Sequence, residues 1–403
     1  MSDTDSPAAG SPSPTGPAHD FSIVLGGPLY QLFLRSRLAK PPLDLLSRRV
    51  LVIPLLTWAP LFVLSLLEGQ AFGGVRLPFL QDLEAQARFL LALPLLILAE
   101  VVVHRRLAPA LALFVEKGIV RPADRARFEA IVASTMRLRN SVAFEVVLLA
   151  FVLTAGHMVW REQFAVHDDT WYAVQAAQGL TLSLAGKCYA WFSLPVFQFV
   201  LLRWFYRIFL WSQLLWRVSR LELQLAPGHP DRAGGLGFLG VSTYAFVPLL
   251  LGQSVVISGM IGSRILNDGA QLPGFKYELA GALCLALLQA LGPLLVFVPA
   301  LVAAKRRGLR EYGLLADRYV REFEGKWLGG GAAPDEALLG SADIQSLADL
   351  GNSFSVVAKM RPVPFGQETV LSLLAVTALP LLPLGLTVVP LDELVRRVLG
   401  VLL

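Results

Sequence analysis

The sequence is poor in charge, in cysteine and in histidine. Charged side chains make up 16% of its 403 residues, hydrophobic ones make up 55%, and the chain has 2 cysteines and 5 histidines. Soluble domains carry about 25% charged residues, so this composition excludes an ordinary soluble globular domain. The two cysteines, Cys188 and Cys284, are too few for a disulfide framework, and we expect two separate thiols.

Short catalytic motifs are also missing. The chain has no GxxxxGK[ST] phosphate-binding loop, no HExxH, no GxSxG and no CxxC. Each of these patterns places nucleophiles, metal ligands or backbone amides at the spacing that its chemistry needs. Their absence removes the usual signals of ATPases, hydrolases and thiol redox enzymes. No catalytic residue, cofactor or metal site is expected, and an enzyme is not the favoured interpretation.

The apolar residues are gathered into long, continuous blocks. Such blocks are typical of membrane-spanning helices, which satisfy their own backbone polar groups in lipid. The sequence therefore predicts an all-α, polytopic membrane protein with about seven transmembrane helices. The predicted spans are 50–67, 89–103, 142–160, 188–210, 239–261, 279–304 and 370–390.

Lysine and arginine are distributed unevenly around these spans. With a cytoplasmic N-terminus, all but eight of the 35 Lys and Arg residues fall on the cytoplasmic side. Because cytoplasmic segments carry the excess of positive charge, we predict a multi-pass protein of the inner (plasma) membrane, N-terminus inside and C-terminus outside. Flanking residues then account for the net charge of +5, and no nucleic-acid partner is expected. The outer residues are Arg76, Arg88, Arg161, Lys187, Arg264, Lys276, Arg396 and Arg397.

The regions outside the spans differ in composition. Residues 1–20 are rich in Ser, Pro and Asp and are expected to be disordered, whereas residues 21–49 are predicted to form an interfacial amphipathic segment. Residues 50–304 hold six spans with their cytoplasmic extensions. Residues 305–366 are predicted to form a cytoplasmic helical region with a Gly-rich linker, part of a small bundle of inner helices. Residues 367–403 hold the seventh span and a short outer amphipathic helix.

Four charged residues lie inside or at the edge of apolar spans. Glu100 and Glu145 are predicted at the inner ends of the second and third spans, and Arg203 and Arg207 lie one turn apart in the last third of the fourth. His104 follows Glu100 by one turn on the same helix face. A charge near the bilayer core costs at least about 2.5 kcal/mol, so such residues are usually paired or functional. The spacing allows either a static ion-pair lock between helices or an ion- or proton-responsive site.

The segment 226–240, APGHPDRAGGLGFLG, is predicted to be a loop that leads into the fifth span. Its residues His229, Asp231 and Arg232 cluster before the paired glycines Gly234 and Gly235. Backbone N–H groups ahead of a helix start can hold an anion or a phosphate. The alternative is a helix-entry turn whose glycines allow close packing.

Proline occurs in six of the seven predicted spans and interrupts helical hydrogen bonding. The best candidates for broken helices are Pro293, beside Gln289, in the sixth span and Pro380 with Pro383 in the seventh. Freed carbonyl groups there could line a polar pathway, as in transporters and channels. The alternative is ordinary packing with hydrogen bonds between helices.

These features favour a transporter or channel-like protein with a charged site in the cytoplasmic third of the membrane. Its topology is similar to that of the insect olfactory-receptor channels, a similarity that implies ion conduction. The alternative is a membrane scaffold or sensor that docks a protein partner through 305–366, where Tyr312, Tyr319 and Trp327 belong to an apolar stripe. A third hypothesis is an integral-membrane enzyme acting on a lipid or phosphate. The lipid bilayer is the expected partner, and a homo-oligomer is compatible with the sequence.

Overall fold

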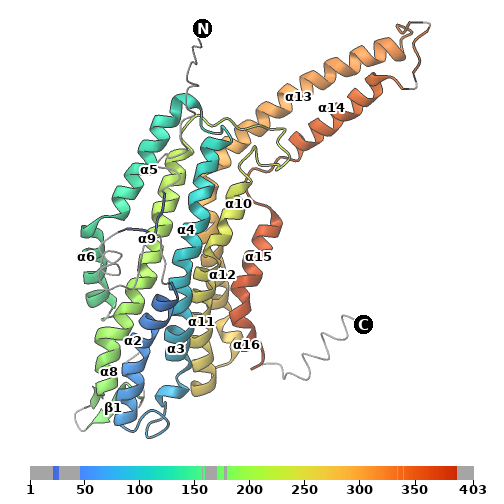
Figure 1. Cartoon of the computed structure of the whole chain (residues 1–403). Helices are drawn as coiled ribbons and strands as arrows, with labels where there is room; N and C mark the ends of the chain where they lie inside the picture. The colour runs from blue at the N-terminus through green and yellow to red at the C-terminus, as the bar shows by residue number, and fades with distance from the viewer. Residues whose placement is uncertain are drawn as a thin grey trace, which may run out of the picture.

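The computed structural model describes residues 21–26, 46–156, 158, 170–176, 179–333, 335–338 and 340–387. It is mostly helical (77%), and six of its helical stretches are long and apolar enough to cross a membrane. Figure 1 shows these helices side by side in one bundle, with a pair of helices projecting from one end. The prediction of a polytopic helical membrane protein is confirmed at this level.

Five of the six stretches are built from two helices that run on into one another. The stretches are α2 (Leu46–Leu67), α3 (Leu83–Gln86) with α4 (Leu93–Glu116), α8 (Leu184–Cys188) with α9 (Leu194–Val218), α10 (Phe238–Ser242) with α11 (Val247–Asp268), α12 (Lys276–Leu291) with α13 (Val298–Trp327), and α15 (Gln367–Ala378) with α16 (Leu382–Gly385).

The turns that join these helix pairs are not α-helical. Two are π-helical, Ala87–Ala92 and Tyr189–Ser193, and three are 3-10 helical, Thr243–Phe246, Gly292–Phe297 and Leu379–Leu381. A proline lies in the first turn of each helix that follows. Its ring removes one hydrogen bond and clashes with the preceding turn, which widens or tightens in response.

Six of the seven predicted spans overlap these stretches. The exception is the third predicted span, 142–160. The predicted span 89–103 is too short, because its helix runs to Glu116, past the charged residues that suggested an end. The predicted span 142–160 begins with α6 (Val142–Phe151), continued by a π-helical turn to Gly156. This apolar helix is shorter than the other six, and most of the remainder of that span lies outside the described residues.

Large hydrophobic side chains remain exposed on the outside of the bundle. Leu51 on α2, Val147 on α6 and Leu371 on α15 are each about 60–65% exposed. A soluble protein rarely exposes such side chains in continuous rows. On helices that cross a membrane these side chains face lipid, so they are not exposed to water at a cost in free energy.

One end of the bundle, called here the hairpin end, is closed by aromatic side chains and a β-hairpin that the sequence did not predict. Strands β1 (Ala173–Ala176) and β2 (Gly179–Leu182) pair antiparallel. Just before them, Trp171 is fully buried and donates its Nε1–H to Asp82 Oδ2 at 2.9 Å, while Asp82 Oδ1 caps α3. The Glu68 carboxylate accepts two amides at the start of α8, so this end is held together by caps between separate elements.

The opposite end, called here the arm end, carries the projecting helix pair. α13 and α14 (Ala342–Ala358) lie antiparallel and form the arm (Figure 1). Asp343 joins them, because its Oδ2 accepts hydrogen bonds from Lys326 Nζ and Trp327 Nε1 and its carbonyl accepts one from Tyr319. Two aromatic residues of the predicted stripe, Tyr319 and Trp327, therefore contact α14 within the same chain. On the same side of the bundle, α5 (Arg125–Arg139) packs against α9.

Residues 21–26 lie inside the bundle rather than at a membrane interface. Phe21, Ile23 and Val24 are at most 2% exposed, and the Phe21 ring lies 6.3 Å from that of Trp211. The interfacial prediction for 21–49 thus differs from the structure at both described parts, since 46–49 belong to α2. The apolar residues that suggested contact with lipid contact the protein core instead. The predicted tail 1–20 and the outer helix after 387 lie outside the described residues.

Candidate functional site

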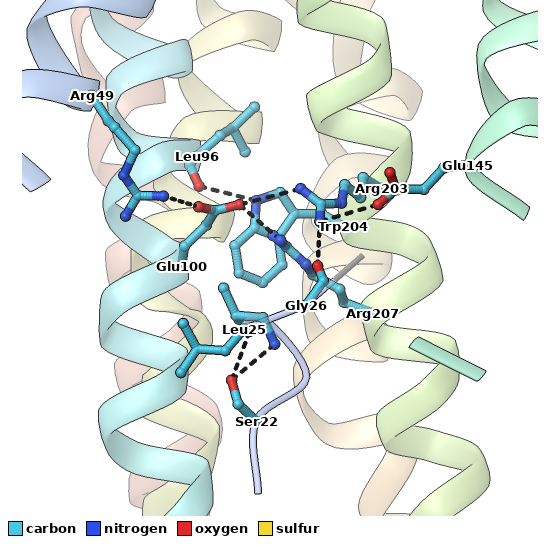
Figure 2. Close-up of polar contacts among 11 residues, drawn as sticks. Ser22, Leu25, Gly26, Arg49, Leu96, Glu100, Glu145, Arg203, Trp204 and Arg207 are labelled. Atoms are coloured by element: carbon cyan, nitrogen blue, oxygen red, sulfur yellow. Dashed lines mark hydrogen bonds and ion pairs between the residues drawn. The ribbon is translucent and has the colours of Figure 1, made fainter. Parts of the chain in front are cut away.

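The charged residues singled out in the spans meet in one buried cluster (Figure 2). Glu100 comes from α4, Glu145 from α6, and Arg203 and Arg207 from α9. Arg49 of α2 joins them and was not predicted. Five side chains from four helices thus form one ionic network, called here the Arg–Glu cluster.

Glu100 is the shared acceptor of the Arg–Glu cluster. Its Oε2 accepts from Arg49 Nη1 at 2.8 Å, and its Oε1 accepts from Arg207 Nη2 at 2.7 Å. Arg203 Nη1 lies 3.9 Å from the same Oε1. Hydrogen bonds between ionised partners at such distances are strong, so one carboxylate ties α2, α4 and α9 together.

Arg203 extends the network to α6 and to the N-terminal segment. Its Nη2 lies 3.2 Å from Glu145 Oε1 and donates to the carbonyl of Gly26 at 3.2 Å. The Arg207 guanidinium lies 4.7 Å from the ring centre of Trp204, whose Nε1–H donates to the Leu96 carbonyl. Aromatic faces and backbone carbonyls therefore supply contacts that the two carboxylates do not.

Among the described residues, guanidinium groups outnumber carboxylates around the segment 21–26. Arg139 of α5 donates to the Ser22 carbonyl and to Asn140 Oδ1. With it, four guanidinium groups surround two carboxylates among the described residues. Glu100, Arg203 and Arg207 each expose 10% or less of their side chains, and burying such charges costs several kcal/mol per ion unless they are well paired. The carbonyls of Ser22 and Gly26 act as extra acceptors in this positive environment.

The acids and bases of the Arg–Glu cluster face one another and not a wet passage. The cavity beside them has a volume of about 10 Å³, and Ile23, Glu145, Arg203 and Arg207 lie in its wall. A single water needs about 10–15 Å³, so at most one fits. The segment 21–26 fills the remaining space.

The sequence did not predict that Arg49 and the segment 21–26 belong to this site. It did predict His104, which lies outside the Arg–Glu cluster. Arg49 directly precedes a predicted span, where an arginine is usually a flanking residue, so no sequence signal separated it from Arg48. His104 makes no contact with the Arg–Glu cluster among the described residues, and its Nδ1 is buried without a hydrogen-bond partner there. Glu100 lies near the middle of the 34-residue stretch Leu83–Glu116, farther from the helix end than predicted.

The loop 226–240 is organised around its own carboxylate. Asp231 accepts backbone hydrogen bonds from Ala233 at 2.8 Å, Gly235 at 3.2 Å and Gly237 at 2.8 Å, and His229 Nδ1 lies 2.9 Å from Oδ1. The amides that were predicted to hold an external anion therefore have an internal acceptor, which such an anion would have to displace. Burial by itself would raise the pKa of Asp231, but these hydrogen bonds outweigh it and lower the pKa below 3.8.

The same loop joins the arm to the bundle. Arg361, which follows α14, donates to the Asp231 carbonyl through its side chain and to the Arg232 carbonyl through its amide. Arg232, Gly234 and Gly235 have positive φ, a conformation that glycine adopts freely. The letters of 235–240 match GxGxxG, but a turn and not a strand precedes them, so the dinucleotide-binding context is missing.

Of the residues predicted to line a polar pathway, Gln289 and Pro293 are buried, whereas Pro383 is exposed. Pro293 and Pro380 lie in 3-10 turns, and Pro383 begins α16, so the helices are broken there as the sequence indicated. Gln289, however, is buried and exchanges two amide hydrogen bonds with Gln253, at 2.9 and 3.0 Å. The two amides satisfy each other's hydrogen bonds. This is the alternative of ordinary packing with hydrogen bonds between helices.

Among the described residues, no three His, Cys, Asp or Glu side chains lie close enough to hold a metal ion, and Cys188 and Cys284 are free thiols.

No protein-family model, no curated protein and no solved structure matches this chain. The topological similarity to the olfactory-receptor channels therefore gains no support from known structures.

Proposed function

We propose that the protein conducts or transports a small anion across the inner (plasma) membrane and that the Arg–Glu cluster is its closed gate. The observation that carries this proposal is the excess of guanidinium groups around the segment 21–26. Arg139 and Arg203 donate to the carbonyls of Ser22 and Gly26. A carbonyl oxygen carries only partial negative charge, so an anion is the stronger acceptor for these groups.

In this proposal the segment 21–26 is the plug of the gate. It fits between α4, α5 and α9 through apolar side chains and carries no charge of its own. Its removal would leave Arg139 and Arg203 with fewer acceptors and would open space beside them. Charged rings of arginine are one way in which pores select anions.

The proposed topology has the arm end in the cytoplasm and seven passages of the chain through the bundle. Val120 pairs with Leu223, which supports placing the ends of α4 and α9 together. Leu77 pairs with Thr170, which supports placing residue 170 at the hairpin end. The chain would then make its third passage between 120 and 170, through α5, α6 and the residues after them. An odd number of passages puts the two termini on opposite sides, and the charge distribution puts the N-terminus inside.

Anion flux into proteoliposomes tests the function directly. We expect a variant lacking residues 1–26 to pass chloride or phosphate faster than a variant lacking residues 1–20, which keeps the plug. Arg203→Gln in the variant lacking 1–26 should reduce that flux, because it removes a guanidinium from the opened site. Absence of anion flux from all three proteins, or equal flux of cations and anions, would refute the proposal.

A second candidate function is the docking of a cytoplasmic protein partner by the arm. The arm projects away from the bundle (Figure 1) and leaves Leu314 and Leu328 about 65% and 77% exposed. Leu314 lies on α13 and Leu328 directly follows it, and neither is among the residues that bond to Asp343. Loss of a stoichiometric partner on Leu314→Asp, with retention on Asp349→Asn, would favour docking over conduction.

A further inference from the structure

A second cavity lies inside the helix bundle, between α4, α9, α11 and α12. Its volume is about 170 Å³, and its wall includes Leu96, Phe197, Leu201, Ile257 and Ala286. All four helices belong to stretches that are long and apolar enough to span a membrane. The cavity is therefore placed at the depth of the lipid chains.

Small residues on two helices create this space. Ala282 and Ala286 lie four residues apart on one face of α12, and Gly252 of α11 packs against α4, where an added Cβ would lie 3.3 Å from the Ala92 carbonyl oxygen. Leucine at either alanine would fill much of the cavity. A larger residue at Gly252 would press on α4.

The cavity wall accepts hydrocarbon and carries no charged side chain, and its polar members are Gln253 and Ser254. No Asp, Glu, Lys, Arg or His lines it, and the amide of Gln253 at its edge is engaged by Gln289. An apolar cavity of about 150 Å³ stays dry and binds benzene-sized groups. A free fatty acid would leave its carboxylate without a charged partner here, so the chain of an intact phospholipid fits better.

The cavity has side access from the bilayer. Phe205 and Leu285 lie in its wall and are 36% and 44% exposed, and Leu288, one turn further along α12, is 63% exposed. These side chains belong to the lipid-facing surface of α9 and α12. A chain can therefore enter between the two helices while its headgroup stays at the membrane surface.

We propose that this cavity is a binding site for the acyl chain of a phospholipid, entered sideways between α9 and α12. The site is independent of the Arg–Glu cluster, although both use Leu96, whose side chain lines the cavity and whose carbonyl accepts the Trp204 Nε1–H. The occupant fills a gap that close-packed helices would otherwise leave empty.

Photolabelling of the full-length protein in liposomes tests this site. The probe is a phosphatidylcholine with a diazirine at the end of one acyl chain, and labelled peptides are mapped by mass spectrometry. We expect the label to concentrate in 197–205 and 252–257. Ala282→Trp should reduce this labelling at least five-fold, because the indole fills the cavity.

The control is Ala280→Trp, which adds the same side chain two residues away, at an exposed position of α12 outside the cavity wall. It should leave the labelling unchanged. Ala286→Leu provides a second cavity-filling variant if Ala282→Trp does not fold. Equal labelling of all lipid-facing helices, unaffected by either cavity-filling variant, would overturn the proposal. A diazirine-bearing free fatty acid that competes with the phospholipid probe would show that the occupant is not an intact phospholipid.

Discussion

At the scale of single residues, Glu100 has the largest predicted effect on stability. Replacing it by Gln leaves three buried guanidinium groups near a neutral side chain, and breaking a buried ion pair costs about 3–5 kcal/mol. We expect Glu100→Gln to lower the melting temperature of the purified protein markedly. Thermal unfolding in detergent, followed by tryptophan fluorescence, measures the effect.

The matched control for this prediction is Glu129→Gln on α5. Glu129 also pairs with an arginine, Arg125 at 3.2 Å, but both side chains are more than a third exposed. An exposed pair contributes about 1 kcal/mol or less. Equal shifts for the two variants would contradict the role given to Glu100.

Asp231 gives the protein a defined sensitivity to acid. Its pKa is lower in the folded loop than its ordinary value of 3.8, so the folded form keeps the carboxylate ionised at a pH where the unfolded form is protonated. The stability that it contributes is complete above pH 3.8 and is lost as the pH falls through the folded pKa. We expect the melting temperature to fall as the pH drops below about 3.8, and to fall less in Asp231→Asn.

This variant should also be less stable at neutral pH, by about 1–3 kcal/mol, because an amide oxygen cannot serve all three backbone donors. Asp349→Asn on the exposed side of α14 is the control and should keep the full pH dependence. A pH dependence that is identical in all three proteins would assign the acid sensitivity to other groups.

The sequence singled out residues whose charge stands alone in an apolar block. Glu100, Glu145, Arg203 and Arg207 were found because each costs free energy in lipid, and all four meet in the structure. Arg49 was not separable from its neighbour Arg48, because position relative to a span edge carries no information on rotation about the helix axis. The prediction that His104 joins the cluster has a similar weakness. Two residues on the same helix face need not bind the same partner.

At the scale of elements, Gly308 controls how the arm meets the bundle. A Cβ at this position would lie 2.4 Å from Pro227 Cβ, so α13 and the loop must separate to accept it. We expect Gly308→Ala to loosen the arm and to increase cleavage in 305–366 by a protease added to solubilised protein.

Gly325→Ala, on the same helix, is the matched control. A Cβ there meets nothing within 4 Å, and alanine favours the helix over glycine by about 1 kcal/mol. Cleavage should therefore stay the same or decrease. An increase in both variants would mean that helix content, and not contact with Pro227, governs the arm.

Elements were predictable where a long apolar or amphipathic pattern defines them. α14 (Ala342–Ala358) lies within the region 305–366 that the sequence predicted to be helical. The hairpin was missed because its eight paired residues have no clear alternation and depend on contacts such as that between Thr170 and Leu77. The burial of 21–26 was missed because apolar residues near a basic segment have the same composition at a membrane surface and in a core.

At the scale of the whole molecule, the proposed topology predicts which positions share a side. In a cysteine-free background, Glu336→Cys in the loop beyond α13 should react with a membrane-impermeant thiol reagent from the cytoplasmic side. Phe72→Cys, in the loop after α2 and 67% exposed, should react only from the other side. Reaction of both positions from the same side would contradict the seven passages.

Whole-molecule features were the hardest to obtain from sequence. Composition established a helical membrane protein, and charge gave an orientation that rests on the distribution of Lys and Arg alone. Packing between distant segments is what buries the Arg–Glu cluster. The plug, the 10 Å³ cavity and the Asp231 carboxylate all depend on such contacts.

The continuation of α12 into α13 through a 3-10 turn has a mechanical consequence. The 30 residues of α13 extend about 45 Å at ~1.5 Å per residue, starting at the 3-10 turn Gly292–Phe297. A change of about 10° in the bend at that turn would swing the far tip through about 8 Å. The arm is therefore built as a lever, which converts a small tilt within the lipid into a displacement large enough to be sensed in the surrounding solution.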